Sequence, residues 1–338
     1  MSMDPKDPSS FNHKTARLST GRTYHFVDQI PGQYDAVTTP TLLCVHGFPD
    51  LWYGWRHQIG PWVKSGYRVV VPDMLGYGDT DKPFDASEYS TKNLCADLAA
   101  LLDFIHVERA VVIGHDWGAF TTARFALWHP DRLLAAAIFS VPYTPPSKQY
   151  IPIQEVASRA PDFGYQVYFA SQESTQTIDA NLRRFVRLLF RRPSSKAPGF
   201  TKLGELKAVL EKDANLDHLD TLLTPEEFEY YLSEFRKGMN GPLNYYRTSK
   251  YRHDEEAAAK LDPKLRANLP VLCIYGSSDP TCLEPLVKKA HKFIPNQKDV
   301  PLTGCGHWIM LEAADQVTNA VLAWLNELQG PKKVNGKL

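Results

Sequence analysis

The sequence predicts an α/β protein whose mostly parallel, twisted sheet is flanked by helices and carries an inserted helical lid. Short apolar runs rich in β-branched residues, typical of buried strands, alternate with amphipathic stretches over roughly the first 140 residues and again near the end. The roughly 120 residues between these regions have helical periodicity and little strand character. We therefore expect a core in residues 1–141 and 267–338 and a helical lid, or cap, in residues 142–266 of the 338.

The first core part is expected to begin with a flexible arm, residues 1–19, because its start is polar and contains prolines. Residues 22–28 alternate in part between polar and apolar side chains, which predicts an edge strand. Two short apolar runs predict buried strands at residues 41–45 and 67–72. Three tryptophans at helical spacing predict a helix at residues 51–64, and a Leu/Ala face predicts a helix at residues 94–105.

The lid begins where the composition changes, at prolines 142, 145, 146 and 152. Helical periodicity then predominates until the sheet resumes, and the tail from residue 330 is expected to be disordered. We expect strands at residues 133–140, 268–276 and 298–303, and helices at residues 181–190, 203–210, 225–237, 283–291 and 312–328.

The stretch that contains Asp116 is expected to lie at the centre of the fold and of the site. Residues 110–113 are a buried strand by composition, Gly114 allows a sharp turn, and Asp116 lies in that turn. Gly118 leaves room for the next helix, which runs to about Trp128. A strand, a tight turn and a helix, with small residues two positions before and after the central one, form the nucleophile elbow of the α/β-hydrolase fold.

The residue at the centre of this elbow is usually serine, and here it is Asp116. A serine oxygen suits acyl transfer, whereas its attack on an sp³ carbon would give an ether that water does not readily reverse. A carboxylate that attacks an sp³ carbon makes an ester, which water can hydrolyse. The sequence therefore predicts an epoxide or an alkyl halide as the electrophile. The alternative for Asp116 alone is a helix N-cap.

Two more residues complete the chain order nucleophile, acid, histidine. Asp279 follows a predicted buried strand, and His307 lies in a glycine-containing turn after the last strand. We expect His307 to be the general base for a water and Asp279 to orient and stabilise its imidazole. Taken singly, Asp279 could be a turn residue and His307 a surface histidine. His115, beside the nucleophile, is expected to be structural, because adjacent side chains at a sharp turn point apart.

The backbone around the elbow is expected to supply an oxyanion hole. Phe48 follows the strand at residues 41–45 in the segment His-Gly-Phe-Pro, and its N–H can face the site together with that of Trp117. The alternative is a plain strand-to-helix turn. Phe48, Trp52, Trp117 and lid aromatics are expected to line an apolar pocket.

Composition excludes several classes of function. The formal net charge is zero, so nothing indicates a nucleic-acid partner. No apolar run reaches the length of a membrane span or a signal core. The five cysteines are scattered singly, which argues against a disulfide framework or a zinc site and favours the cytoplasm. No metal or organic cofactor is expected.

The core motifs at residues 46–49, 114–118 and 306–308 resemble those of the soluble epoxide hydrolases, a family with the α/β-hydrolase fold. The resemblance extends from about residue 20 to residue 328. Haloalkane dehalogenases share the core motifs, so the lid carries the more specific signal. The phosphatase domain that precedes the hydrolase in some animal members is expected to be absent.

The lid segments at residues 162–169 and 241–247 are similar to those that carry the tyrosines of this family, at the positions of Tyr165 and Tyr246. The resemblance implies that both phenols bind the epoxide oxygen and protonate it as the ring opens. Without the resemblance, lid packing is the alternative for these tyrosines. Tyr168 and Tyr245 are expected to be packing or pocket residues.

The resemblance and the residues together predict an epoxide hydrolase acting on small hydrophobic epoxides with water. Asp116 would form a hydroxyalkyl ester, and a water activated by His307 would hydrolyse it to a vicinal diol. The main alternative is a haloalkane or haloacid dehalogenase, although Phe48 offers no side-chain donor for a halide. A non-catalytic ligand receptor of the same fold is a second alternative. The sequence leaves monomer and homodimer open.

Overall fold

A sheet of eight strands forms the centre of the protein, for which the computed structural model describes residues 3–212 and 215–329. The strand order is β1-β2-β4-β3-β5-β6-β7-β8. β2 is antiparallel to both β1 and β4, and every pair from β4 to β8 is parallel, so the predicted fold class is confirmed. The strands are β1 (His13–Arg17), β2 (Thr23–Gln29), β3 (Thr41–Val45), β4 (Arg68–Pro72), β5 (Ala110–His115), β6 (Leu133–Phe139), β7 (Val271–Gly276) and β8 (Gln297–Leu302).

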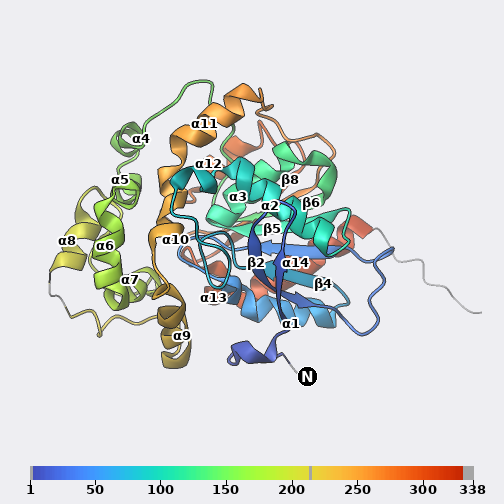
Figure 1. Cartoon of the computed structure of the whole chain (residues 1–338), viewed down its shortest axis with the longest axis horizontal. Coiled ribbons are helices and arrows are strands. Elements are labelled where there is room, and N and C mark those ends of the chain that lie inside the picture. Colours follow the sequence, from blue (N-terminus) through green and yellow to red (C-terminus); the bar gives the residue numbers. More distant parts are fainter. Residues whose placement is uncertain (1–2, 213–214, 330–338) are drawn as a thin grey trace, which may run out of the picture.

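Helices cover both faces of the sheet (Figure 1). For that reason β3, β5 and β7 are buried along their whole length and carry continuous apolar runs. α1 packs against α14, and α2 packs against α3; in this view α1 lies below the strands, and α2 and α3 lie above them. The core helices are α1 (Arg56–Lys64), α2 (Thr91–Phe104), α3 (Trp117–Trp128), α12 (Glu284–Ala290), α13 (Ile309–Glu312) and α14 (Ala314–Gln329).

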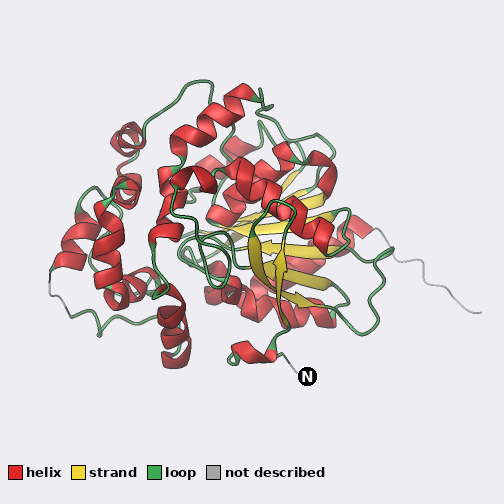
Figure 2. Cartoon of the chain, viewed as in Figure 1, coloured by secondary structure: helices red, strands yellow, loops and turns green. Residues whose placement is uncertain are grey.

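Between β6 and β7 the described chain forms helices in place of sheet strands. Figure 2 shows most of them gathered on the side of the molecule away from the strands. They stand beyond the carboxyl ends of the parallel strands, where α/β sheets bind ligands. These helices are α4 (Ile153–Arg159), α5 (Gly164–Ala170), α6 (Glu173–Ala180), α7 (Leu182–Leu189), α8 (Glu205–Glu211), α9 (Pro225–Phe235), α10 (Asn240–Asn244) and α11 (Ser249–Ala258).

The structure corrects two predictions at the start of the chain. The segment expected as a flexible arm contains β1, and β2 is therefore an inner strand and not the edge of the sheet. β1 escapes sequence analysis because Ala16 is its one buried residue, so it has no apolar alternation. Its backbone pairing with β2 holds it in place, and its exposed charged side chains are typical of an edge strand.

The remaining predicted core elements are present with shifted ends. The helix expected over residues 51–64 begins as a 3₁₀ turn, Trp52–Trp55, before α1. The closing helix expected over residues 312–328 is α14, and a short helix that was not predicted, α13, precedes it. In the lid, α4, α5, α6, α10 and α11 were not predicted, because their apolar periodicity does not stand out in the sequence. The tail expected to be disordered lies outside the described residues.

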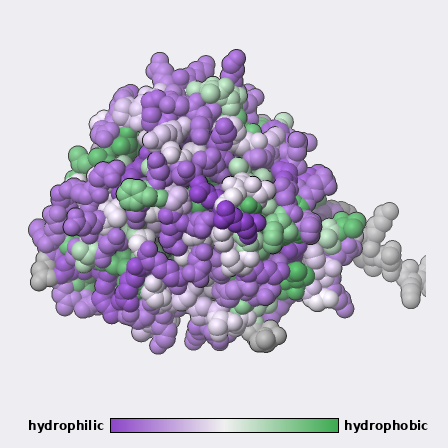
Figure 3. All heavy atoms as spheres, in the orientation of Figure 1, coloured by the Kyte–Doolittle hydropathy of each residue, from purple (hydrophilic) through white to green (hydrophobic). Residues whose placement is uncertain are grey.

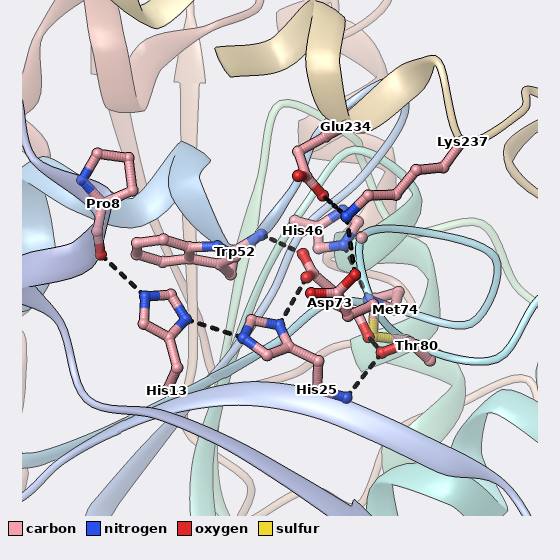
Figure 4. A network of polar contacts seen from close by, with 12 residues as sticks. Pro8, His13, His25, His46, Trp52, Asp73, Met74, Thr80, Glu234 and Lys237 are labelled. Carbon is pink, nitrogen blue, oxygen red and sulfur yellow. Dashed lines mark hydrogen bonds and ion pairs between the residues drawn. The ribbon is translucent and has the colours of Figure 1, made fainter.

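A row of polar contacts joins the first two strands to the loop after β4 (Figure 4). His13 Nε2 lies 2.8 Å from the Pro8 carbonyl oxygen, and its Nδ1 lies 2.8 Å from Nε2 of His25. Nδ1 of His25 lies 2.7 Å from the buried carboxylate of Asp73. The carbonyl and the carboxylate only accept, so each ring donates from the nitrogen that faces them. The row thus ties both strands to Asp73.

On the surface, hydrophobic residues form small separate patches among polar ones on the face shown in Figure 3, as on most folded proteins. Within residues 3–212 and 215–329, none of the helices combines the length and the apolar character needed to cross a bilayer.

Candidate active site

Asp116 lies in a strained turn between β5 and α3. Its φ of 53° is in the left-handed region that residues other than glycine rarely adopt. Two glycines permit the close approach of the strand and the helix. A Cβ on Gly118 would lie 2.0 Å from the carbonyl oxygen of Val45, and one on Gly114 would lie 2.1 Å from the carbonyl oxygen of Gly118. The turn therefore lifts the Asp116 side chain above the carboxyl edge of the sheet, as in a nucleophile elbow.

The Asp116 carboxylate meets the backbone of the loop after β3. The N–H of Phe48 donates to Oδ1 of Asp116 at 2.8 Å. Gly47 precedes it, and a Cβ there would lie 2.4 Å from Cβ of Asp116, so only glycine allows this approach. Trp117 is the first residue of α3, where an N–H has no partner within the helix. The amide of Phe48 is thus placed beside the carboxylate, and the amide of Trp117 is free of a partner within the helix.

His307 and Asp279 lie on the loops after β8 and β7, at the same edge of the sheet as Asp116. Nδ1 of His307 lies 2.8 Å from Oδ2 of Asp279, and Nε2 lies 3.5 Å from Oδ2 of Asp116. The other oxygen of Asp279 accepts the N–H of Thr281 at 2.8 Å and its hydroxyl at 2.7 Å. Asp279 is thereby fixed, and its bond to Nδ1 directs Nε2 toward Asp116.

His307 and Asp279 stabilise each other's charged forms, and Asp116 adds to the effect on His307. Burial alone would lower the pKa of His307, but the charge of Asp279 and the contacts with Asp116 outweigh it and raise the pKa well above the usual value. Burial alone would raise the pKa of Asp279, but the charge and hydrogen bond of His307 and the bonds from Thr281 lower it. An imidazolium at His307 is therefore stabilised, as a base that collects a proton requires.

Above the carboxylate lies a cavity of about 340 Å³. Asp116, Asp279 and His307 border it on the side of the sheet. Much of the remaining wall is apolar or aromatic and comes from the core and from the helices between β6 and β7. Those apolar residues include Phe48, Phe169, Leu189, Phe200 and Trp308.

Tyr165 of α5 and Tyr246 of the 3₁₀ turn Tyr245–Arg247 both border this cavity. Their ring centroids lie 6.4 Å apart. Burial raises the pKa of both phenols, and the negative charge of Asp116 raises it further. Both side chains are therefore neutral at neutral pH and able to donate a proton into the cavity.

Trp117 and Trp52, two aromatic residues expected to line the pocket, do not lie on the cavity wall. Trp117 stands against Tyr246, with ring centroids 5.2 Å apart, and is not on the cavity wall. The expectation that Trp52 lines the pocket is wrong, because its ring is buried against Phe11 and its indole N–H donates to Tyr230. A helical spacing of tryptophans indicates a buried face but not which cavity it borders.

Three polar side chains of the site were not predicted. Thr281 binds Asp279, Ser140 binds the backbone of His307, and Glu312 binds the backbone on both sides of His307. Ser140 ends a predicted strand, and Glu312 begins a predicted helix, where an acidic residue is ordinary. Of the three, only Thr281 could have been predicted from the sequence, because it lies two residues after Asp279.

Residues 40–314 match the family described as alpha/beta hydrolase fold. Together with the strand order and the elbow, this match makes the chain an α/β-hydrolase-fold protein, here with a carboxylate in the place of the nucleophilic serine. Epoxide hydrolase A of Mycobacterium tuberculosis is 34% identical over 299 residues, which cover 86% of this chain and 91% of that protein. Epoxide hydrolase srdG of Neurospora crassa is 30% identical over 341 residues, which cover 96% and 98%. The chain belongs to the epoxide hydrolase family.

Other comparisons agree with this membership. Bifunctional epoxide hydrolase 2 of Mus musculus is 32% identical over 333 residues, but the chain spans only 58% of the length of that relative. The solved structure of an epoxide hydrolase from an endophytic Streptomyces is 30% identical, with a TM-score of 0.82 over 94% of this chain and 96% of that one. Epoxide hydrolase VrEH1 from Vigna radiata is 27% identical, with a TM-score of 0.79 over 95% and 99%.

Proposed function

We propose that this protein hydrolyses epoxides to vicinal diols through a covalent ester on Asp116. Asp116, Asp279 and His307 form the catalytic triad, Tyr165 and Tyr246 protonate the epoxide oxygen, and the amides of Phe48 and Trp117 form the oxyanion hole. One observation carries the proposal. A carboxylate nucleophile and two neutral phenols border the same largely apolar cavity.

In the first step, Oδ2 of Asp116 attacks an epoxide carbon and forms a C–O bond. Oδ1 is already engaged by the N–H of Phe48 at 2.8 Å, which leaves Oδ2 as the attacking atom. The bond between that carbon and the ring oxygen breaks, and the ring oxygen takes a proton from Tyr165 or Tyr246. The product is a hydroxyalkyl ester, because the carboxylate has become an acyl group.

In the second step, Nε2 of His307 takes a proton from a water, whose oxygen attacks the ester carbonyl carbon of Asp116. The negative charge moves to Oδ1, beside the amides of Phe48 and Trp117. When the intermediate collapses, the diol oxygen leaves and receives the proton from His307, and the carboxylic acid left at Asp116 releases its proton to solvent. The phenolate formed in the first step regains its proton from solvent. No metal or organic cofactor takes part in the proposed reaction.

The shape of the site suggests the substrate class. The largely apolar wall suits a hydrophobic epoxide, whose ring oxygen would face the phenols of Tyr165 and Tyr246. We assign residues 142–266 to the lid and residues 1–141 and 267–338 to the core. We propose that the partners are this epoxide and water, without nucleic acid, and that the protein acts as a monomer or homodimer.

We also propose a reducing, cytoplasmic setting. All five cysteines lie in the described part of the chain, and each is free and buried. Buried thiols without a partner are ordinary in such a compartment. The residues concerned are Cys44, Cys95, Cys273, Cys282 and Cys305.

A single turnover in ¹⁸O-labelled water, with enzyme in excess over styrene oxide, tests the covalent route. The first diol should contain no label, because its new oxygen comes from Asp116, and the label should appear in the enzyme. Label in the first diol would rule out the ester. Halide release from a bromoalkane in place of diol formation would identify a dehalogenase, and binding without turnover would identify a receptor.

A further inference from the structure

The peptide groups on both sides of His307 are held by one carboxylate. Oε2 of Glu312 accepts the N–H of Gly306 at 2.7 Å, and Oε1 accepts the N–H of Trp308 at 2.9 Å. The two oxygens of a single side chain thus fix the residue before and the residue after the histidine. Glu312 lies in α13, which follows this loop directly, and it borders the active-site cavity.

The carbonyl group of His307 is held from the opposite direction. Its oxygen accepts the hydroxyl of Ser140 at 2.8 Å and lies 2.9 Å from Nε2 of His115. These two donors occupy both lone pairs of the oxygen. Ser140 directly follows β6 and has a φ of 58°, an uncommon conformation that persists only where the surroundings enforce it. His115 ends β5.

His115 has the protonation state that this role requires, and the carboxyl group of Glu312 is subject to opposing effects. Burial lowers the pKa of His115 to about 4, so its imidazole is neutral and donates Nε2–H to the carbonyl. A neutral ring with its centroid 4.9 Å from that of His307 does not oppose an imidazolium there. Burial raises the pKa of Glu312, while the two N–H groups and the charge of His307 act in the other direction.

We propose that Glu312, Ser140 and His115 are positioning residues that hold the imidazole of His307 in place for the second half of the reaction. The inference rests on the proposed two-step function. Attack by Asp116 and protonation by the tyrosines need no proton transfer at His307. Hydrolysis of the ester does, because Nε2 must reach a water that is aligned with the ester carbonyl. A displacement of about 1 Å can cost roughly 100-fold in the rate of such a step.

The central experiment compares Glu312→Gln with wild type by rapid quench and intact-mass measurement. A glutamine oxygen can accept one N–H, but its amide group opposes the other, so the loop loses one of its two restraints. Ester hydrolysis should slow by 10-fold to 100-fold while ester formation changes less than about 3-fold. The hydroxyalkyl enzyme should therefore accumulate in the steady state. Glu327→Gln, the same change at an exposed side chain, should not accumulate it.

Ser140→Ala supplies a second test if Glu312→Gln does not fold. The positive φ of residue 140 is equally uncommon for alanine and for serine. The variant therefore removes one hydrogen bond to the His307 carbonyl and little else. It should also accumulate ester, to a smaller extent. Equal losses in both half-reactions, or no accumulation in a folded variant, would overturn the inference.

His307→Gln separates this inference from the proposed function. That variant should trap the ester permanently, because it lacks the base. If His307→Gln traps ester and Glu312→Gln and Ser140→Ala do not, the positioning role is wrong and the covalent mechanism stands. If no ester forms even in His307→Gln, the proposed mechanism itself is wrong.

Discussion

Nε2 of His307 lies 3.5 Å from Oδ2 of Asp116, so the base is separated from the nucleophile by slightly more than a direct hydrogen bond. The pair is held together by charge, and that charge changes during the proposed reaction. Alkylation of Asp116 converts an anion into a neutral ester and removes one of the interactions that raise the pKa of His307.

We therefore predict that the pKa of His307 is lower in the ester than in the free enzyme. In the free enzyme, burial opposes protonation, but Asp279 and Asp116 outweigh it and raise the pKa. With Asp116 esterified, more of the imidazole is neutral at a given pH and able to act as the base. Ester hydrolysis followed by stopped flow should rise with pH through an inflection below the pKa that NMR gives for His307 in the free enzyme. Coincident values would contradict this coupling.

The two lid tyrosines should act in ring opening. Replacing Tyr165 and Tyr246 together by phenylalanine should slow ester formation at least ~1000-fold, because each phenol that could protonate the epoxide oxygen is lost. Pre-steady-state burst kinetics with styrene oxide measure this step. Tyr143→Phe is a matched control, since that buried hydroxyl donates to the Pro263 carbonyl outside the cavity. A double variant with near-normal burst rates would remove both tyrosines from the mechanism.

A buried ion pair should fasten the lid to the core. Nε of Arg56 in α1 lies 2.8 Å from Oε1 of Glu227 in α9, and both side chains are at least 95% buried. Glu227→Gln should lower the free energy of unfolding by about 3–5 kcal/mol, because it leaves a buried guanidinium without its counterion. Replacing both residues, as in Arg56→Met with Glu227→Leu, should restore most of the loss. Urea denaturation of the single and double variants measures the coupling, and additive losses would contradict it.

The proton that His25 binds beside Asp73 should make stability depend on pH. Burial alone would lower the pKa of His25, but the hydrogen bond and charge of Asp73 outweigh it and raise the pKa, with smaller contributions from Asp79 and Glu234. Because the folded state binds this proton more tightly, the stabilisation is complete below the unfolded pKa of about 6.5 and is lost as pH rises through the raised pKa.

The difference in unfolding free energy between wild type and His25→Asn should therefore be largest in mildly acidic buffer and shrink as the solution becomes alkaline. Thermal or urea denaturation over a pH series measures it. His218→Gln, at an exposed histidine, serves as the control. A difference that stays constant across the series would show that His25 titrates no differently in the folded and unfolded chains.

The sequence located the fold and the residues around Asp116 because strong local rules apply there. Buried strands that end in glycine-containing turns identify the sheet edge, and the residues at those turns must meet. The family resemblance supplied Tyr165 and Tyr246, which no periodicity could have separated from packing tyrosines. Their roles remain predictions, although the structure brings both to the cavity of Asp116.

Other features depend on contacts that sequence does not encode locally. β1 lacks an apolar pattern and is fixed by backbone pairing with β2 and by polar side-chain contacts such as that of His13 with His25. Glu312 is indistinguishable in sequence from an acid at a helix start, and its partners are main-chain groups. Trp52 has the spacing of its neighbours but faces the N-terminal segment, because only tertiary packing decides which side of a short helix meets which cavity.

The glycines of the elbow determine the position of residue 116 but not the chemistry of its side chain. A Cβ on Gly114 or Gly118 would meet a main-chain carbonyl oxygen first, and one on Gly47 would meet the Cβ of Asp116 first, an atom that every residue but glycine possesses. A designer can therefore exchange the reactive group at this position while the scaffold still presents it at the same spot. Repurposing the protein for another chemistry becomes a matter of choosing a nucleophile and matching partners, with the bend itself left untouched.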